Sequence, residues 1–116
     1  MRLSFDEMTA SQREALALFV DDIEVLNALA DSNRQRIIIL LGSHLRTGMT
    51  VTEITGQMNL SQPAVSHHLK ILKQVKIVGS KKNGLQNIYS LTLDNTLLKL
   101  EKLVASIRAS LQDIEE

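Results

Sequence analysis

The stretch of residues 61–91 changes its hydrophobic period from that of a helix to that of a strand, which restricts the folds open to the chain. Ser61 can cap a helix, and Pro63 suits the first turn because no backbone N–H is needed there. The apolar residues that follow on one helical face are Val65, Leu69 and Leu72. Beyond residue 77 the pattern becomes that of two strands around Asn83-Gly84, a two-residue hairpin signal. The sequence therefore predicts an amphipathic helix followed directly by a β-hairpin.

A second, shorter helix is predicted just before this one. Thr52 can cap it, it runs through Met58, and a turn leads from Asn59 to Ser61. The outward face of the longer helix is polar and contains Pro63, Ser66, His67, Lys70 and Gln74. Two short helices joined by a tight turn, here over about residues 50–74, are typical of a helix-turn-helix whose second helix enters the major groove of DNA.

The distribution of charge favours a nucleic-acid partner. The net charge is zero, which by itself argues against a general binder of polyanions. However, residues 54–93 contain no acid at all. The cations of this stretch are Lys70, Lys73, Lys76, Lys81 and Lys82. We therefore expect a positive field over the predicted helix-turn-helix and hairpin.

The predicted hairpin, over about residues 77–91, has a basic and amide-rich tip. A type I′ turn at Asn83-Gly84 predicts a register that pairs Val78 with Tyr89, Ser80 with Asn87, Lys82 with Leu85 and Lys81 with Gln86. Lys81, Lys82 and Gln86 then lie where they suit contacts with phosphates or with a minor groove. The hairpin is therefore expected to act as a wing beside the helix-turn-helix.

Apolar spacing predicts three further helices in the first part of the chain. They cover about residues 4–20, a stretch from Asp21 to Leu29, and a stretch from a cap at Asp31 to about Leu45. The expected core residues of the third helix are Ile37, Ile38, Leu41 and Leu45. Arg34 and Arg36 lie in its first turn, where the helix dipole disfavours cations. They suggest an anion from outside the chain, although plain solvent exposure explains Arg36 equally well.

The last predicted helix, over about residues 94–115, carries a heptad seam. Its apolar residues, spaced alternately four and three apart, are Leu93, Leu97, Leu100, Val104, Ile107, Leu111 and Ile114. Such a stripe is more than a small domain needs for its own core, so a partner helix is implied. The alternative is that the seam packs only against its own domain.

From Leu26 to Leu91 the chain resembles the ArsR/SmtB family of bacterial winged-helix repressors. Residues 28–41, 60–72 and 78–91 carry the resemblance, and the Ser-Gln start followed by Val-Ser-His-His-Leu-Lys in the middle stretch is the most specific part. The resemblance implies a mainly α winged helix-turn-helix with a small β-hairpin. It further implies dimerisation through the first and last helices, with two recognition helices that contact an inverted repeat of DNA.

The family's DNA contacts can be carried over to matching positions. They fall on Ser61, Gln62, Ser66, His67 and Lys70 of the recognition helix and on Lys81 and Lys82 of the wing. The predicted DNA-binding set is completed by His68, Gln86 and Arg34. Because His68 lies near the edge of the apolar stripe, a packing role for it is at least as consistent with the pattern as a base contact.

The family's known metal sites lack their ligands in this chain. Where arsenic and lead sensors have thiolates, this chain has Thr50-Val51-Thr52, and it contains no cysteine. Where other sensors place histidine along the last helix, this chain has only the acids Asp94, Glu101, Asp113, Glu115 and Glu116. Its histidines are His44, His67 and His68, and the last two lie about 100° apart on one helix. No metal and no cofactor are expected.

A chain of 116 residues suits one domain, so a single domain over residues 1–116 is expected. No apolar run approaches a bilayer span and the first residues do not resemble a signal peptide, so we expect a cytoplasmic protein with no membrane partner. No catalytic constellation is present, which argues against an enzyme. The expected function is a homodimeric, sequence-specific transcriptional repressor that binds double-stranded DNA. The alternative is a winged-helix dimer that acts as a protein-interaction module with weak or no DNA binding, and the existence of a small-molecule effector stays open.

Overall fold

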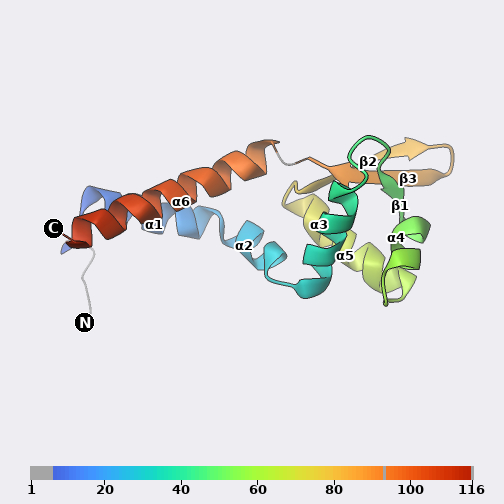
Figure 1. The fold of residues 1–116 in the computed structure, drawn as a ribbon, viewed down its shortest axis with the longest axis horizontal. Coiled ribbons are helices and arrows are strands. Elements are labelled where there is room, and N and C mark those ends of the chain that lie inside the picture. The colour runs from blue at the N-terminus through green and yellow to red at the C-terminus, as the bar shows by residue number, and fades with distance from the viewer. Residues whose placement is uncertain (1–6, 93, 116) are drawn as a thin grey trace. The chain divides into compact units, whose positions relative to one another are not determined.

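The computed structural model describes residues 7–92 and 94–115, apart from the side chains of residues 94 and 113–115. Within these residues the chain is mainly helical with a small antiparallel sheet, which confirms the predicted winged-helix class (Figure 1). In chain order the elements are α1 (Ala10–Asp21), α2 (Ile23–Leu29), α3 (Ser32–Gly42), β1 (Met49–Thr50), α4 (Val51–Gln57), α5 (Gln62–Gln74), β2 (Val78–Asn83), β3 (Gln86–Leu91) and α6 (Asp94–Glu115). No helix in this part of the chain is long and apolar enough to cross a membrane.

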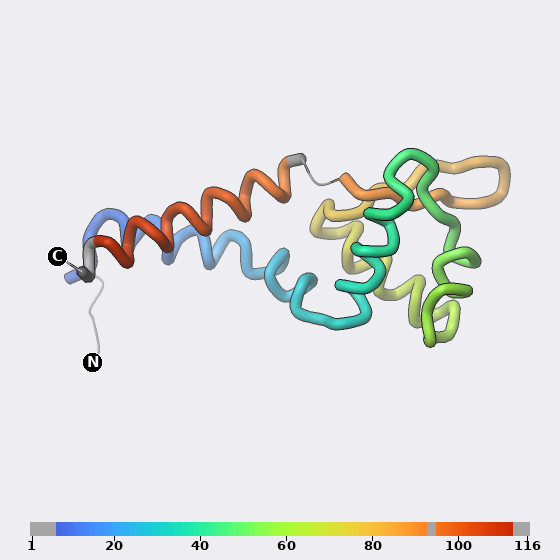
Figure 2. The backbone as a smooth tube through the Cα atoms, in the orientation of Figure 1, coloured from blue at the N-terminus to red at the C-terminus, as the bar shows by residue number. Residues whose placement is uncertain are grey.

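The elements group into two compact units. One contains Val25–Thr96 and so holds α3, α4, α5 and the sheet. The other contains Met1–Glu24 and Leu97–Glu116 and so holds α1 and most of α6. Figure 2 follows the chain from α1 through α2 to the helix-turn-helix, and from the hairpin back into α6. That the whole chain acts as one domain stays a prediction.

The first helix begins later than its apolar spacing predicts. The hydroxyl of Thr9 accepts a hydrogen bond from the backbone N–H of Gln12 at 3.1 Å, and the Gln12 side chain accepts one from Thr9 N at 3.0 Å. This reciprocal pair is a capping box, which starts α1 at Ala10. The predicted helix over 4–20 is therefore wrong at residues 7–9, and its residues 4–6 lie outside the described part of the chain.

The start of α3 agrees with the prediction. The carboxylate of Asp31 accepts hydrogen bonds from the backbone N–H groups of Asn33 at 2.9 Å and Arg34 at 3.0 Å. These two bonds satisfy donors that have no partner within the helix, so Asp31 is the N-cap.

The end of α3 differs from the prediction. The helix stops at Gly42, and the chain turns so that His44 O accepts a hydrogen bond from Gly48 N at 2.9 Å. Leu45 lies in this turn and is 65% exposed, so the prediction that it joins the core was wrong. Ile37 and Leu41, one helical turn apart, are fully buried as predicted.

A short strand before the helix-turn-helix was not predicted. Met49 pairs with Tyr89 and Thr50 with Ile88, which makes β1 the third strand of a sheet in the order β1-β3-β2. Thr50 also caps α4, because its hydroxyl accepts from the backbone N–H of Glu53 at 3.2 Å. The predicted cap at Thr52 was therefore wrong by two residues.

The hairpin has a different register from the predicted one. The observed pairs are Val78 with Leu91, Gly79 with Ser90, Ser80 with Tyr89, Lys81 with Ile88, Lys82 with Asn87 and Asn83 with Gln86. The turn is Gly84-Leu85, with Gly84 at φ +67° in the first central position, where a type II′ turn requires glycine. Each residue of β2 therefore pairs two positions later than predicted. A shift of two keeps every side chain on its predicted face.

The core of the larger unit forms on the predicted stripe of α5. Val65, Leu69 and Leu72 have no exposed surface. The other fully buried residues of this unit include Ile37, Leu41, Ile54 and Ile77. Burial of this stripe leaves the polar side of α5 as its outer face.

The carbonyl of Lys76 links the end of α5 to the segment after β3. Lys76 adopts a left-handed conformation with φ 63°, and Ile77 N then donates to Leu72 O at 3.0 Å. The Lys76 carbonyl accepts hydrogen bonds from the hydroxyls of Thr92 at 3.0 Å and Thr96 at 3.3 Å. This turn thus anchors the first residues of α6 in the larger unit.

Candidate nucleic-acid interface

The outer face of α5 combines exposure with polar chemistry. The helix starts at Ser61, whose hydroxyl accepts from the backbone N–H of Ala64 at 3.3 Å, as the sequence predicts. The exposed residues of the face are Gln62, Pro63, Ser66, His67, Lys70 and Gln74. The first turn carries no acid, so nothing there repels a phosphate from the positive end of the helix dipole. The face can therefore offer hydroxyl, amide, imidazole and ammonium groups to one ligand.

The hairpin offers cations at its tip. Lys81, Lys82 and Gln86 are all exposed, and they lie within a few residues of the Gly84-Leu85 turn. In the observed register Lys81 pairs with Ile88 and not with Gln86. Lys81 and Lys82, as neighbours on one strand, point to opposite faces of the sheet. One lysine is thus available on each face of the hairpin.

Lys73 has a structural role that the sequence did not predict. Its ammonium group donates a hydrogen bond to the Ser80 hydroxyl at 2.7 Å, which joins the last turn of α5 to β2. The bond ties the orientation of the hairpin to that of the helix. Since the partner lies seven residues away across a turn, only the folded chain brings the two groups together.

Arg34 is held by the backbone of α2 and by its own N-cap. Its Nε donates to Ala28 O at 2.7 Å and its Nη2 donates to Asn27 O at 3.1 Å. Its Nη1 lies 3.9 Å from the Asp31 carboxylate, and only 14% of the side chain is exposed. The carbonyls at the end of α2 and the Asp31 carboxylate therefore supply the negative partners that the sequence suggested would come from outside. Arg36 is exposed, in agreement with the simpler explanation.

The same cluster affects the ionisation of Asp31. The hydrogen bond from the backbone N–H of Arg34 and the positive charge of the guanidinium stabilise the carboxylate, so they lower the pKa of Asp31 below its ordinary value. Asp31 therefore stays ionised beside Arg34 at neutral pH.

His68 connects α5 to this cluster. Its Nδ1 lies 3.3 Å from Nη1 of Arg34, although the two residues are 34 positions apart in the sequence. His68 is half-buried, whereas the neighbouring His67 is exposed. Their ring centroids are 6.1 Å apart. The two histidines thus occupy different environments on one helix.

The predicted dimer seam lies on α6, in the other compact unit. Leu97 is 51% exposed, Val104 54% and Leu111 55%, while Leu100 and Ile107 are half-buried. The buried side of α6 within the smaller unit is formed instead by Leu103 and Ser106. The side chain of Ile114 lies outside the described residues.

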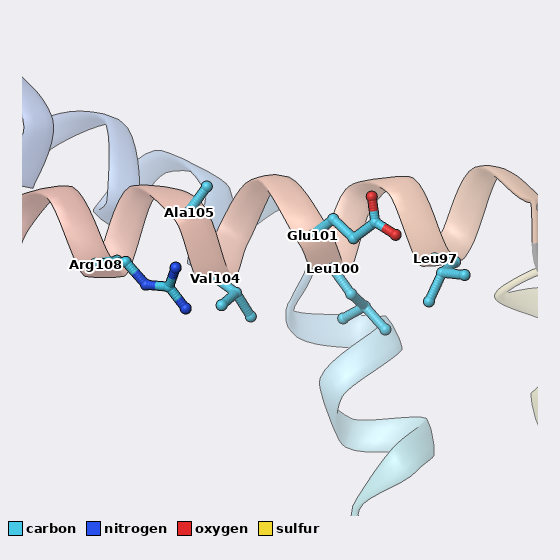
Figure 3. Close-up of a pocket in the computed structure, with 6 residues that line it drawn as sticks. All are labelled: Leu97, Leu100, Glu101, Val104, Ala105 and Arg108. Atoms are coloured by element: carbon cyan, nitrogen blue, oxygen red, sulfur yellow. The ribbon is translucent and has the colours of Figure 1, made fainter.

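An open groove of about 370 Å³ follows this seam. It is lined by Leu97, Leu100, Glu101, Val104, Ala105 and Arg108. Figure 3 shows the side chains of Leu97, Leu100 and Val104 on one side of α6. Because all lining residues belong to a single helix, the groove has no opposing wall of its own.

Metal ligands do not gather in the described part of the chain. Within residues 7–92 and 94–115, apart from the side chains of 94 and 113–115, no group of three or more histidine, cysteine, aspartate or glutamate residues could hold an ion. His44, the histidine outside α5, instead has its Nδ1 at 3.0 Å from Leu40 O.

Comparisons with known proteins agree with the fold. Residues 31–80, which span α3 to the middle of β2, match the model of the family described as bacterial regulatory protein, arsR family. An HTH-type transcriptional regulator of Methanocaldococcus jannaschii is 36% identical over 81 residues, which cover 70% of this chain and 88% of that protein. The transcriptional repressor SdpR of Bacillus subtilis is 37% identical over 67 residues, covering 58% and 71% of the two chains.

Solved structures support the same fold. An ArsR-like transcriptional regulator from Rhodococcus sp. RHA1 superimposes with a TM-score of 0.68 at 24% identity, over 86% of this chain and 92% of that one. The matched relatives are DNA-binding transcriptional regulators and not enzymes. The winged helix-turn-helix, its acid-free outer helix face and these relatives together lead to one conclusion: the chain belongs to the ArsR family of transcriptional regulators.

Proposed function

We propose that the protein is a homodimeric repressor that binds an inverted-repeat operator, with α5 in the major groove and the β2–β3 hairpin along the phosphates. The observation that carries the proposal is the outer face of α5, which is exposed, polar and free of acids directly opposite a fully buried stripe. A helix of this kind can approach DNA without losing its core contacts.

In this proposal the helix and the wing have different tasks. Ser66 and His67 lie on the outer face of α5 and can form hydrogen bonds with base edges, whereas Lys81 and Lys82 contact phosphates. Ser61, Gln62 and Lys70 lie on the same helix or at its cap and hold it in the groove. Gln86 lies beside the wing lysines. Arg34 acts through His68 and α2, because its side chain is already engaged.

The second subunit is proposed to cover the α6 groove. The groove lacks an opposing wall, and its residues Leu97 and Val104 are about half exposed in the single chain. Glu101 and Arg108 flank it, and a two-fold antiparallel contact centred between them would place Glu101 against Arg108 of the partner subunit. On α1, Phe19 is 41% exposed and Val20 65%, which adds exposed apolar surface to the unit that carries the seam.

The DNA-binding part is tested with a duplex selected by the wild-type protein from a random pool. Changing Lys81 and Lys82 together to Ala should weaken binding to all duplexes alike. The slope of log affinity against log salt concentration (the salt slope) should become shallower by about one per lost phosphate contact. Changing Ser66 to Ala should leave the slope unchanged and reduce discrimination by roughly 1–3 kcal/mol. The matched control changes Lys99 and Lys102, two exposed lysines of α6 outside the unit that carries the interface.

The outcomes separate the proposal from its alternatives. The double change at Lys99 and Lys102 removes the same charge and should leave affinity, salt dependence and sequence preference intact. If the wild-type protein selects no duplex, DNA binding is wrong and the protein is an interaction module. If the wing variant loses sequence preference while Ser66→Ala loses only general affinity, the roles of helix and wing are reversed.

The dimer is tested by sedimentation. Val104→Glu places a charge on an exposed seam position, where it should not disturb the fold but should yield monomers that bind the operator poorly. Lys102→Gln changes the net charge by the same amount on the exposed opposite side of the helix and should stay dimeric. A Val104→Glu protein that remains a dimer would show that the seam is not the interface.

A further inference from the structure

The contact between Arg34 and His68 determines which nitrogen of the histidine carries the proton. A guanidinium group has only N–H donors and stays protonated in proteins. The hydrogen bond from Nη1 of Arg34 to Nδ1 of His68, at 3.3 Å, therefore needs a free lone pair on Nδ1. In a neutral imidazole the other nitrogen, Nε2, must then carry the proton.

This arrangement is rigid, because Arg34 cannot easily turn away. Its Nε and Nη2 are bound to Ala28 O and Asn27 O, at 2.7 Å and 3.1 Å. The side chain is 14% exposed, and the Asp31 carboxylate lies close to the same Nη1. By contrast, His67 is exposed, and the described residues form no hydrogen bond to its ring. The neighbouring histidines therefore differ in whether their tautomer is fixed, which the sequence does not reveal.

We propose that Arg34 fixes His68 as a one-sided donor, so that its Nε2–H binds a hydrogen-bond acceptor on the DNA. The inference rests on the proposed function, and it specifies donor and acceptor in one of the contacts with DNA. His68 lies on α5 at the border between the buried stripe and the outer face, and it is half-buried, so part of the residue is open to solvent. Donation by the charged Arg34 to one side of the ring also strengthens the donor on the other side.

A fixed donor restricts what His68 can recognise. In the major groove the acceptors are N7 of either purine, O6 of guanine and O4 of thymine, while the amino groups of cytosine and adenine are donors. Phosphate oxygens are acceptors as well. His68 is thus a residue that selects acceptors, and Arg34 is the positioning residue that gives it this selectivity. An unrestrained histidine would accept from amino groups equally well.

The protonation state is measured without DNA, by nitrogen NMR of the imidazoles at mildly alkaline pH. His68 should show a single tautomer with the proton on Nε2, whereas His67 should average over both. Arg34→Met should bring His68 to the same average. Arg34→Lys should do so too, because a compact ammonium group lacks the planar fork with which the guanidinium reaches the α2 carbonyls and the ring at once. Circular dichroism checks that both variants fold. If both unfold, the wild-type spectrum alone decides, and a His68 that averages over tautomers would overturn the inference.

The contact itself is tested with two amide substitutions at His68. His68→Gln keeps a donor near the position of Nε2, whereas the shorter His68→Asn keeps an acceptor near Nδ1 for Arg34 but places no donor near Nε2. On the duplex selected by the wild-type protein, His68→Asn should lose roughly tenfold or more in preference over a scrambled duplex, and His68→Gln should lose clearly less. A purely structural role predicts the reverse order, because Asn preserves the bond to Arg34.

Modified duplexes distinguish the sources of the acceptor. Replacing purines by their 7-deaza forms removes N7, replacing guanine by 2-aminopurine removes O6, and replacing thymine by 5-methyl-2-pyrimidinone removes O4. Replacing single phosphates by methylphosphonates removes the charged oxygen. One of these series should abolish the difference between His68→Asn and the wild type at a single position. If the wild-type protein selects no duplex, the proposed function fails and this contact with it. If it selects one that His68→Asn binds with unchanged preference, only the contact is wrong.

Discussion

Gly48→Ala should be among the most destabilising small substitutions in the chain. Gly48 adopts φ +65°, and a Cβ there would lie 2.6 Å from Tyr89 O and 2.7 Å from Cγ2 of Ile88. The left-handed conformation costs a residue with a Cβ roughly 1–2 kcal/mol. Displacing the paired β3 backbone adds about 1–3 kcal/mol, the usual cost of overpacking. The free energy of unfolding should therefore fall by about 2–5 kcal/mol.

Two other glycines provide matched controls for the same substitution. Gly84 has φ +67° but open space where a methyl group would lie, so Gly84→Ala should cost only the conformational part, about 1–2 kcal/mol. Gly56 lies in α4 with open space around it, so Gly56→Ala should stabilise the protein by roughly 0.5–1 kcal/mol. The three substitutions add the same methyl group in three environments.

Urea unfolding followed by circular dichroism gives the comparison. The protein concentration is held constant, because the stability of the proposed dimer would depend on it. From most to least stable, the expected order is Gly56→Ala, wild type, Gly84→Ala and Gly48→Ala, with equal m-values. If Gly48→Ala is no less stable than Gly84→Ala, the close approach of β1 to β3 does not constrain this position, and the argument from the sheet is wrong.

Three further predictions concern a strained backbone, a capping carboxylate and metals. Lys76→Gly should raise the free energy of unfolding by roughly 0.5–1 kcal/mol because φ 63° suits glycine, whereas Lys76→Ala should not raise it, and urea unfolding checks both. The hydrogen bonds from Thr50 lower the pKa of Glu53, so this carboxylate stabilises the protein above about pH 4.3, the ordinary glutamate value, and the stabilisation is lost as the pH falls through the depressed pKa. Glu53→Gln keeps the capping geometry, so its melting temperature should fall less steeply than that of the wild type as the pH is lowered. Equal dependence of the two melting temperatures on pH would contradict this. Chelators and added zinc should leave both the melting temperature and DNA affinity unchanged, and stoichiometric zinc in a binding titration would refute that.

The helices that carry the candidate interface could be predicted because their signals are local. The spacing of Val65, Leu69 and Leu72 defines the buried face of α5 without knowledge of what covers it. Ser61 and Asp31 cap helices through bonds to residues two or three positions away, so their roles are visible in the sequence. The capping boxes at Thr9 and Thr50 are also visible, as Thr-x-x-Gln and Thr-x-x-Glu, but apolar spacing alone places both helix starts elsewhere.

The hairpin shows where local signals stop being sufficient. Both Asn83-Gly84 and Gly84-Leu85 satisfy the rules of a two-residue turn, and they differ only in the register they impose. The sheet selects the second, in which Val78 is 2% exposed and pairs with Leu91. The two residues of β1 have no period at all, so this strand exists only through its pairing with β3.

The sequence alone determined the amphipathic recognition helix, the acid-free positive stretch, the seam on the last helix and the family, because each depends on residues close together in the chain. Only the tertiary structure decided what Arg34 does. In the sequence it is a cation at the unfavourable end of a helix, which suggests an external anion. In the fold its donors meet two carbonyls of α2 and a histidine 34 positions away. Hydrogen bonds between distant residues depend on the packing of whole helices, and no local spacing encodes that packing.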